Sequence, residues 1–161
     1  MTENENIRIR LVKKLIEKKL HIATAESLTG GMISEMITDV PGASGVLELG
    51  VCSYSNRIKH EVLNVPQDIL DRFTEYSSET ARAMAKGVRL AAGADIAVST
   101  TGIAGPGGDL PGKPVGSVWI GISTAEGESA KEYHFTGSRD EVRRAAALEA
   151  LSLALQEAEK F

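Results

Sequence analysis

Apolar residues recur at helical spacing over residues 7–20, with lysine and arginine on the opposite face, and this pattern predicts an amphipathic helix. The short apolar run over residues 21–25 predicts a strand. A second helical pattern starts at Thr29 or Gly30 and ends before Pro41, because proline cannot continue a helix. The chain is therefore expected to begin with a helix, a strand and a second helix.

The rest of the chain alternates in the same way. Helical patterns cover residues 56–63, 67–73, 138–160 and a segment from Ser77 or Ser78 to Gly93, and apolar runs predict strands over residues 46–54, 95–100, 115–123 and 129–135. The last two strands are joined by residues 125–128 as a hairpin. This order predicts an α/β fold: a three-layer α/β/α sandwich with a mixed, mostly parallel five-stranded sheet, in a single domain of residues 1–161.

Composition narrows the possible functions. The net charge of -4, with both signs interspersed, argues against a nucleic-acid surface. Cys52 is the one cysteine, which excludes an intramolecular disulfide, and its apolar neighbours predict a buried, structural thiol. The three histidines show no metal-ligand spacing, so neither a metal nor a cofactor is expected. No apolar run reaches membrane-spanning length and no signal-peptide pattern is seen, so we expect a cytoplasmic protein without a membrane partner.

The segment over residues 23–31 carries the first chemical signal. An apolar strand stops at Ser27, and two glycines, Gly30 and Gly31, follow at the start of a helical pattern. Backbone N–H groups at such a turn have no helical partner and can bind an anion or a developing oxyanion. Ser27 or Thr29 could equally be only an N-cap, with the glycines only permitting close packing.

Polar residues follow the other strands as well. Ser27, Tyr54, Lys59 and Thr101 are expected near strand ends, where open α/β sheets keep their ligand sites, and Arg143 is expected to join them from the last helix. A serine nucleophile needs a base, and no histidine stands in a matching position, which leaves Lys59, relayed by Tyr54, as the candidate. Lysine can act as a base only if its pKa is depressed, and spacing alone favours a solvent-facing lysine.

Two further stretches contain residues of the kinds that bind phosphate. Residues 107–114 nearly match a P-loop, but Pro114 stands where a hydroxyl residue is needed and a strand follows instead of a helix. Arg139, Arg143 and Arg144 lie in the first turns of the last helix, against the macrodipole preference for acidic residues there. Either a bound anion or salt bridges to acidic residues would account for that placement.

Five motifs taken together identify a relationship. They are Ala25-Glu26-Ser27-x-Thr29-Gly30-Gly31, Tyr54-Ser55-Asn56-x-x-Lys59, Ser77-x-Glu79-x-Ala81-Arg82-Ala83-Met84, Thr101-Gly102-Ile103-Ala104-Gly105-Pro106-Gly107-Gly108 and Lys113-Pro114-Val115-Gly116-x-Val118. In this order they resemble the CinA C-terminal domain family, from about the first helix to the last. Members of that family look like nicotinamide-mononucleotide amidohydrolases of the PncC type, which form nicotinate mononucleotide and ammonia.

The resemblance implies a role for each matching residue. Ser27 would be the nucleophile, activated by Lys59 and Tyr54, and the carboxamide oxyanion would bind backbone N–H groups near Thr29 to Gly31. The substrate, a small nucleotide, would be held by a set of loop residues and arginines: Thr29, Gly30, Gly31, Thr101, Gly102, Gly105, Gly107, Arg139 and Arg143. No cofactor is implied, and a homo-oligomer is expected.

Two other functions use the same residues. A non-catalytic nucleotide-binding or competence-related regulatory module would need the glycine loop and an arginine but not Ser27, Tyr54 and Lys59. An amidase with another substrate would keep those three and differ in its need for a phosphate.

Overall fold

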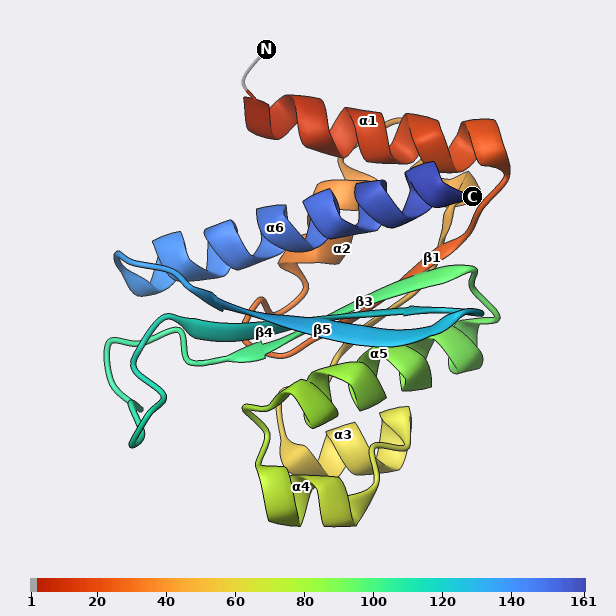
Figure 1. The fold of residues 1–161 in the computed structure, drawn as a ribbon. Coiled ribbons are helices and arrows are strands. Elements are labelled where there is room, and N and C mark those ends of the chain that lie inside the picture. Colours follow the sequence, from red (N-terminus) through yellow and green to blue (C-terminus); the bar gives the residue numbers. More distant parts are fainter. Residues whose placement is uncertain (1–2) are drawn as a thin grey trace.

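The computed structural model describes residues 3–161, which form a five-stranded sheet between two layers of helices (Figure 1). The strand order is β2-β1-β3-β4-β5. The five strands are β1 (Ile22–Glu26), β2 (Leu47–Cys52), β3 (Ile96–Gly102), β4 (Ser117–Thr124) and β5 (Gly127–His134). β1 pairs in parallel with β2 and β3, whereas β4 is antiparallel to both of its neighbours. Four strands therefore point one way, which confirms the predicted mixed, mostly parallel sheet.

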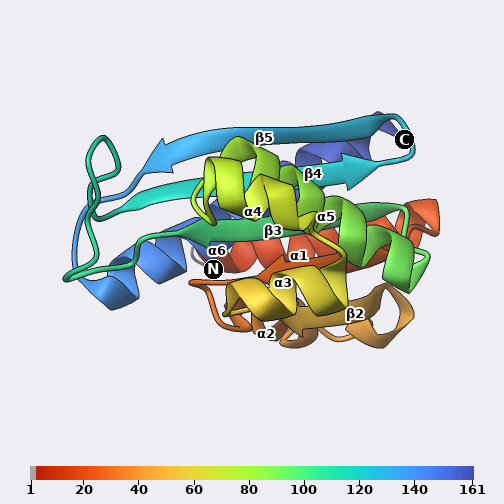
Figure 2. The same cartoon turned by 90° about the horizontal axis from the view of Figure 1, so that it is seen from below.

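The helices divide between the two faces of the sheet. One layer contains α1 (Glu3–Lys18), α2 (Met32–Thr38) and α6 (Arg139–Lys160), and the other contains α3 (Asn56–Leu63), α4 (Gln67–Phe73) and α5 (Ser78–Ala92). Figure 2 shows the second layer in front of the sheet. A short 3₁₀ turn, Ala43–Gly45, precedes β2. The expected three-layer sandwich is confirmed.

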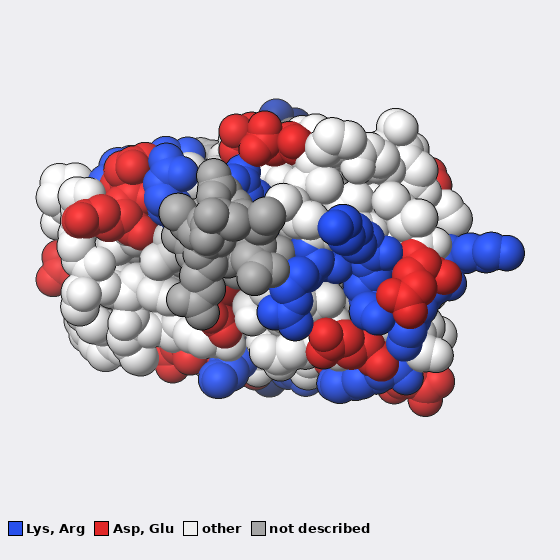
Figure 3. Space-filling model, turned by 90° about the horizontal axis from the view of Figure 1, so that it is seen from above, with Lys and Arg blue, Asp and Glu red and all other residues white. Residues whose placement is uncertain are grey.

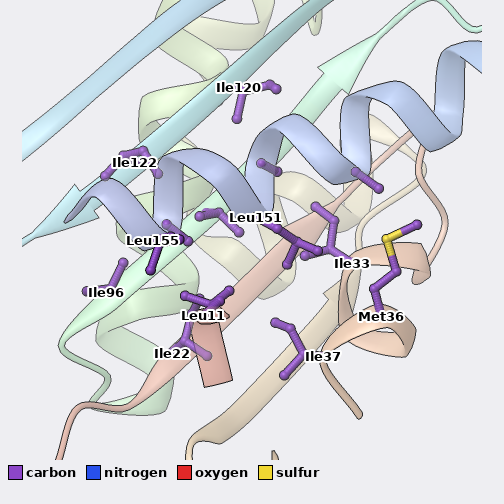
Figure 4. Packing of buried hydrophobic residues seen from close by; sticks show 14 of the residues in the cluster. Leu11, Ile22, Ile33, Met36, Ile37, Ile96, Ile120, Ile122, Leu151 and Leu155 are labelled. Atoms are coloured by element: carbon purple, nitrogen blue, oxygen red, sulfur yellow. The ribbon is translucent and has the colours of Figure 1, made fainter. Parts of the chain in front are cut away.

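Each face of the sheet has its own apolar core. The larger core packs α1, α2 and α6 on the sheet, with Leu11, Ile22 and Leu151 buried together (Figure 4). The smaller core packs α3, α4 and α5 on the other face, around Met84 and Val88. β1 and β3 are buried along their whole length because both faces of these central strands are covered.

β2 corrects one expectation. It lies at the edge of the sheet and alternates between half-buried and exposed residues. The thiol of Cys52, at its end, is exposed, so the prediction of a buried thiol was wrong. The apolar composition of residues 46–54 was typical of a central strand, but a strand with one free edge needs less burial.

Several boundaries also differ from the sequence pattern. α2 begins at Met32 and not at Thr29 or Gly30, because Gly30 and Gly31 have positive φ values of 60° and 104°, which α-helices do not use. The hairpin between β4 and β5 turns through residues 125–126 alone, since Thr124 and Gly127 already pair.

The molecular surface carries charges of both signs. On the face with α1, Lys and Arg lie beside Asp and Glu (Figure 3), and pairs such as Arg8–Asp39 and Lys14–Glu17 bridge 2.6 and 2.8 Å. Among the helices of residues 3–161, none combines the length and apolar character needed to cross a membrane.

Candidate active site

The polar residues predicted at strand ends meet at one edge of the sheet. Ser27 directly follows β1, Tyr54 follows β2, and Gly102 ends β3. After β1 the chain crosses to β2 on one side, and after β2 it crosses back past β1 to β3. The carboxyl ends of β1 and β3 therefore flank a topological switch point, which is where open α/β sheets bind ligands.

A pocket of about 400 Å³ lies at this switch point. Its lining comes from the turns after β1, β2 and β3, from the segment between α4 and α5, and from the first residue of α6. These residues are Ser27, Leu28, Tyr54, Ser55, Asn56, Lys59, Glu75, Tyr76, Gly102, Ile103, Ala104, Gly105, Gly107, Gly108 and Arg139. Five segments far apart in the chain thus build one site.

Ser27 and Lys59 form a buried pair in this pocket. The Nζ atom of Lys59 donates to Oγ of Ser27 at 3.2 Å and to the carbonyl oxygen of Ser53 at 2.9 Å. Lys59 is 1% exposed and Ser27 8%. Burial lowers the pKa of Lys59 to about 8, although the carboxylate of Glu75 opposes this effect. The expectation from spacing, a solvent-facing lysine, was therefore wrong, and Lys59 loses its proton more readily than an exposed lysine does.

Helix α3 determines the position of Lys59. The Oγ atom of Ser55 accepts the N–H of Ile58, so Ser55 is the N-cap of the helix. Lys59 is the fourth residue of the helix and lies on the face that packs inward with Leu63. A short capped helix thus directs one lysine at the end of β1.

Tyr54 and Arg139 form the rim of the pocket. Nη2 of Arg139 donates to the hydroxyl of Tyr54 at 2.9 Å, and Nη1 donates to the carbonyl oxygen of Gly105 at 2.9 Å. Tyr54 is 62% exposed. Among the described residues, the Tyr54 hydroxyl has Arg139 as its partner and neither Ser27 nor Lys59.

The N–H groups at the start of α2 are not available to a ligand. The buried carboxylate of Glu26 accepts the N–H groups of Gly31, Ile33 and Ser34 at 2.9–3.0 Å. The N–H of Gly30 donates to the carbonyl oxygen of Ser27. Gly30 and Gly31, two of the three residues whose N–H groups were expected to bind the oxyanion, thus already donate to acceptors within the protein.

Four of the expected binding residues support the pocket from behind. Thr29 is buried, and its hydroxyl pairs with that of Thr100 at 2.7 Å. Arg143 donates through Nε to the carbonyl oxygen of Leu28 at 2.8 Å and through Nη2 to that of Thr29 at 3.3 Å. Thr29, Arg143, Gly30 and Gly31 are not among the residues that line the pocket. Thr29 and Arg143 instead hold the turn that carries Ser27.

The glycine loop after β3 does line the pocket. Gly102, Gly105 and Gly107 are all part of the wall. A Cβ atom on Gly102 would lie 2.5 Å from the carbonyl oxygen of Ser117, and one on Gly105 would lie 2.4 Å from Val115. Thr101 lies beneath this wall, where its hydroxyl donates to the carbonyl oxygen of Glu75 at 2.5 Å.

Acidic residues at the start of α6 offset only part of its arginine charge. Ser138 and Glu141 form a capping box, with Oε2 of Glu141 accepting the N–H of Ser138 at 2.6 Å. Arg144 lies 3.8 Å from the carboxylate of Asp140. A salt bridge therefore accounts for the placement of Arg144, whereas Arg139 and Arg143 donate to neutral oxygens.

Sequence reasoning missed Glu75 and Tyr76 in the pocket wall. They stand in the loop between α4 and α5, ahead of the Ser77 N-cap of α5. The hydrogen bond from Thr101, 26 positions further along the chain, brings this loop to the pocket. No local pattern reports such a contact, so only the presence of a charged and an aromatic residue side by side in a short loop could have drawn attention to it.

A second and larger pocket, of about 530 Å³, opens between α5 and the α3–α4 segment. Its floor is apolar and includes Leu63, Ile69 and Leu90. Its charged residues pair with one another, as in Arg82–Glu79 at 3.8 Å and Lys86–Glu128 at 4.0 Å. Ser27 and Lys59 line the first pocket and are not part of the lining of this one. Among the described residues, no three His, Cys, Asp or Glu side chains gather as metal ligands.

Comparison with known proteins agrees with this architecture. The family model described as the CinA C-terminal domain matches residues 4–158. This chain belongs to the CinA C-terminal domain family. The resemblance of the five motifs is therefore confirmed over nearly the whole length of this CinA domain.

Curated relatives carry the same name. A CinA-like protein of Syntrophotalea carbinolica is 46% identical over 147 residues, which are 91% of this chain and 36% of the relative. A putative competence-damage inducible protein of Caldanaerobacter subterraneus subsp. tengcongensis is 46% identical over 151 residues, 94% of this chain and 36% of the relative. The CinA domain thus spans about a third of the length of these relatives.

Solved structures share its fold. The competence damage-inducible protein A (ComA) of Klebsiella pneumoniae subsp. pneumoniae superposes with a TM-score of 0.95 at 27% identity, over 99% of each chain. The competence/damage inducible protein CihA of Agrobacterium tumefaciens gives 0.92 at 34% identity, over 97% of each chain. Both likenesses confirm the predicted sandwich.

Proposed function

We propose that this CinA domain hydrolyses the carboxamide of nicotinamide mononucleotide to nicotinate mononucleotide and ammonia. The observation that carries the proposal is the buried pair of Ser27 and Lys59, 3.2 Å apart, with the pKa of Lys59 lowered to about 8. A neutral lysine beside a serine hydroxyl is a nucleophile with its base. The substrate itself is suggested by the family resemblance and by a pocket that joins this pair to an arginine.

The reaction would proceed through an acyl-enzyme. Neutral Lys59 takes the proton of Ser27 while Oγ attacks the carboxamide carbon, and a tetrahedral oxyanion forms. The C–N bond then breaks as Lys59 returns the proton to the leaving nitrogen, which departs as ammonia. A water molecule, deprotonated by Lys59, attacks the ester, and Ser27 recovers its proton.

The oxyanion needs a donor other than the start of α2. Leu28 follows the nucleophile and lines the pocket, and among the described residues its N–H has no hydrogen-bond acceptor. We assign this N–H to the oxyanion, in place of the amides of Thr29 to Gly31. One such donor contributes about 3 kcal/mol to stabilisation of a transition state.

Arg139 is the residue we assign to the phosphate. Its guanidinium lies at the rim between Tyr54 and the glycine loop, and the planar fork of arginine suits phosphate oxygens. Tyr54 would then position Arg139 and does not act on Ser27. Arg143, whose donors are used by Leu28 and Thr29, supports the nucleophile turn.

The test is ammonia release from nicotinamide mononucleotide, measured for the wild type, Ser27→Ala and the matched control Ser152→Ala on α6. We expect Ser27→Ala to lower turnover by about 10⁴-fold or more and to leave binding nearly unchanged. Ser152→Ala should behave as the wild type.

Two outcomes would contradict the proposal. Turnover by Ser27→Ala at the wild-type rate would remove Ser27 from the chemistry. Nucleotide binding without ammonia release from the wild type would favour a regulatory module. Nicotinamide riboside, which lacks the phosphate, distinguishes the third possibility, since equal rates on both compounds would indicate a different amide as substrate.

A further inference from the structure

Glu75 and Tyr76 stand in the pocket wall without a role in the proposed mechanism. Neither is among the residues that the family resemblance assigns to the site. Both lie in the short loop between α4 and α5, which has no apolar cluster of its own. A charged and an aromatic side chain side by side in a substrate pocket call for an explanation.

The loop is held by a set of internal hydrogen bonds. Thr101 donates to the carbonyl oxygen of Glu75 at 2.5 Å. The hydroxyl of Thr74 accepts from Nζ of Lys113 at 3.1 Å and from the N–H of Tyr76 at 3.3 Å. Thr74 itself has a φ of 66°, outside the usual range for a β-branched residue. The position of Glu75 and Tyr76 is therefore built into the fold and not left to an open loop.

The carboxylate of Glu75 has no cation within salt-bridge distance among the described residues. Nδ2 of Asn56 donates to its Oε2 at 3.3 Å. One hydrogen bond from a neutral amide does not neutralise a carboxylate, and Lys59 acts on Glu75 only from beyond salt-bridge distance. Glu75 is part of the pocket lining, so a ligand bound in the pocket lies close to it.

This charge works against the base. The Glu75 carboxylate raises the pKa of Lys59, whereas a base near neutral pH benefits from a lower one. A neutral residue at position 75 would serve Lys59 better if the substrate carried no charge near it. The charge is explained if the bound ligand brings a positive charge of its own.

We propose that Glu75 and Tyr76 form a subsite for a positively charged aromatic ring, so that the pocket prefers cationic carboxamides to neutral ones. The inference rests on the proposed function and specifies its substrate class. A carboxylate attracts the ring by charge, and a tyrosine face adds a cation–π contact. The pyridinium ring of nicotinamide mononucleotide has this character, because its ring nitrogen is quaternary.

The same arrangement links substrate binding to the state of the base. A cation beside Glu75 offsets the field that this carboxylate exerts on Lys59, so the pKa of Lys59 is lower in the complex than in the free protein. The other charged or titratable groups around Lys59 are Arg139, Tyr54 and Tyr76 in the pocket and Glu26 behind the nucleophile turn. The effect of these groups on the pKa of Lys59 is the same whether the bound substrate is cationic or neutral.

The test compares nicotinamide mononucleotide with benzamide mononucleotide, its neutral carbon-linked isostere. Dissociation constants and kcat/KM are measured for the wild type, Glu75→Gln and the control Glu126→Gln, which makes the same charge change in the β4–β5 turn. We expect Glu75→Gln to weaken binding and kcat/KM for the cation by about tenfold and to leave the neutral isostere unchanged. Glu126→Gln should match the wild type with both ligands.

The pH profiles give an independent readout. For the cationic substrate, the acidic limb of kcat should lie at lower pH than that of kcat/KM, because the two report the complex and the free protein. This separation should be absent with the neutral substrate, and in Glu75→Gln the acidic limb of kcat/KM should lie at lower pH than in the wild type, because the carboxylate that raises the pKa of Lys59 is gone. A loss that is equal for both ligands would mean a structural role for Glu75 and would overturn the inference, as would no loss for either.

Failure of the reaction and failure of the subsite are distinguishable. If the wild type releases no ammonia but binds the cation more tightly than the isostere, and Glu75→Gln removes that preference, the proposed reaction fails and the subsite stands. If ammonia is released from both compounds with equal kcat/KM, the reaction stands and the subsite fails.

Discussion

At the scale of single residues, Lys59 is the position where burial changes the chemistry. An exposed lysine holds its proton at neutral pH, whereas Lys59 is 1% exposed and its pKa is lowered to about 8. The sequence placed Lys59 on a short helix near a strand end but predicted a solvent-facing side chain. Which side of that helix packs inward depends on contacts with α5. The spacing of apolar residues within α3 does not predict these contacts.

Burial of this lysine should cost stability, which leads to a prediction for Lys59→Met. Methionine fills a similar volume without a charge, so turnover should be lost while the free energy of unfolding rises by about 1–2 kcal/mol at pH 7. The ordinary pKa of lysine is 10.5, above the folded value of about 8. Between these values the unfolded chain binds more protons, so wild-type stability rises with pH over that window and the advantage of Lys59→Met shrinks.

Denaturant unfolding of both proteins at pH 7 and pH 10 measures this effect. The control is Lys131→Met on the edge strand β5, where Nζ packs over the ring of Tyr133. A lower stability of Lys59→Met at pH 7, in a protein that still folds, would show that the hydrogen bonds of Lys59 outweigh its desolvation.

Glu75 is the residue that no sequence pattern revealed. Its neighbours in the chain suggested only a helix start at Ser77 or Ser78, and α5 begins at Ser78 with Ser77 as its N-cap. The role of Glu75 comes from a hydrogen bond to Thr101 on another strand. Residues that enter a site through a tertiary contact of this kind lie beyond prediction from spacing.

At the scale of elements, the turn between β1 and α2 is organised by an internal carboxylate. The sequence correctly located a strand-to-helix turn at Ser27 and two glycines after it. It did not reveal that Glu26 points back to accept three N–H groups of the helix start. Periodicity identifies where a helix begins but not which side chain satisfies its free amides, since any acceptor within reach can do so.

The contact between α3 and α5 gives a second prediction, for Gly87→Ala. Alanine in place of glycine inside a helix normally adds about 1 kcal/mol of stability. Here a Cβ atom would lie 1.9 Å from the carbonyl oxygen of Leu63, and backbone cannot yield as a side chain does. We expect the free energy of unfolding to fall by about 2 kcal/mol. Turnover should also fall, because Lys59 lies one turn before Leu63.

Thermal unfolding and ammonia release check this change against Gly45→Ala. Gly45 lies in the 3₁₀ turn, and no heavy atom stands within 4 Å of the Cβ position there. A stabilised, fully active Gly87→Ala protein would refute the view that close packing of α3 on α5 positions the base.

At the scale of the whole molecule, alternation of helices and strands predicted the layers but not the order of the strands. The composition of residues 46–54 indicated a buried strand, yet β2 lies at the edge of the sheet and Cys52 is exposed. Burial of a strand depends on how many neighbours it has, and the chain order does not state this. The switch point between β1 and β3 follows from the strand order, so the site could be suspected but not located from the sequence.

The two cores of unequal size predict how the molecule opens. β1 and β3 are buried throughout, whereas α3 and α4 pack on the smaller core. Native-state hydrogen exchange should show that amides of β1 and β3 exchange only through global unfolding, while those of α3 and α4 exchange through smaller openings. Exchange measured by mass spectrometry with increasing denaturant separates the two classes. Equal free energies of opening for the amides of α4 and β3 would contradict this prediction.

The contacts of Arg143 determine when, during synthesis of the chain, the turn that carries Ser27 is fixed in place. The carbonyl oxygens of Leu28 and Thr29 accept hydrogen bonds from Arg143 on α6. This arginine is translated more than a hundred residues after them. When all five strands have been synthesised, the turn that carries Ser27 still lacks its hydrogen bonds from Arg143. The proposed activity would thus be available only at the end of synthesis, and a chain interrupted before α6 has every strand of the sheet but lacks the contact that fixes the turn carrying Ser27.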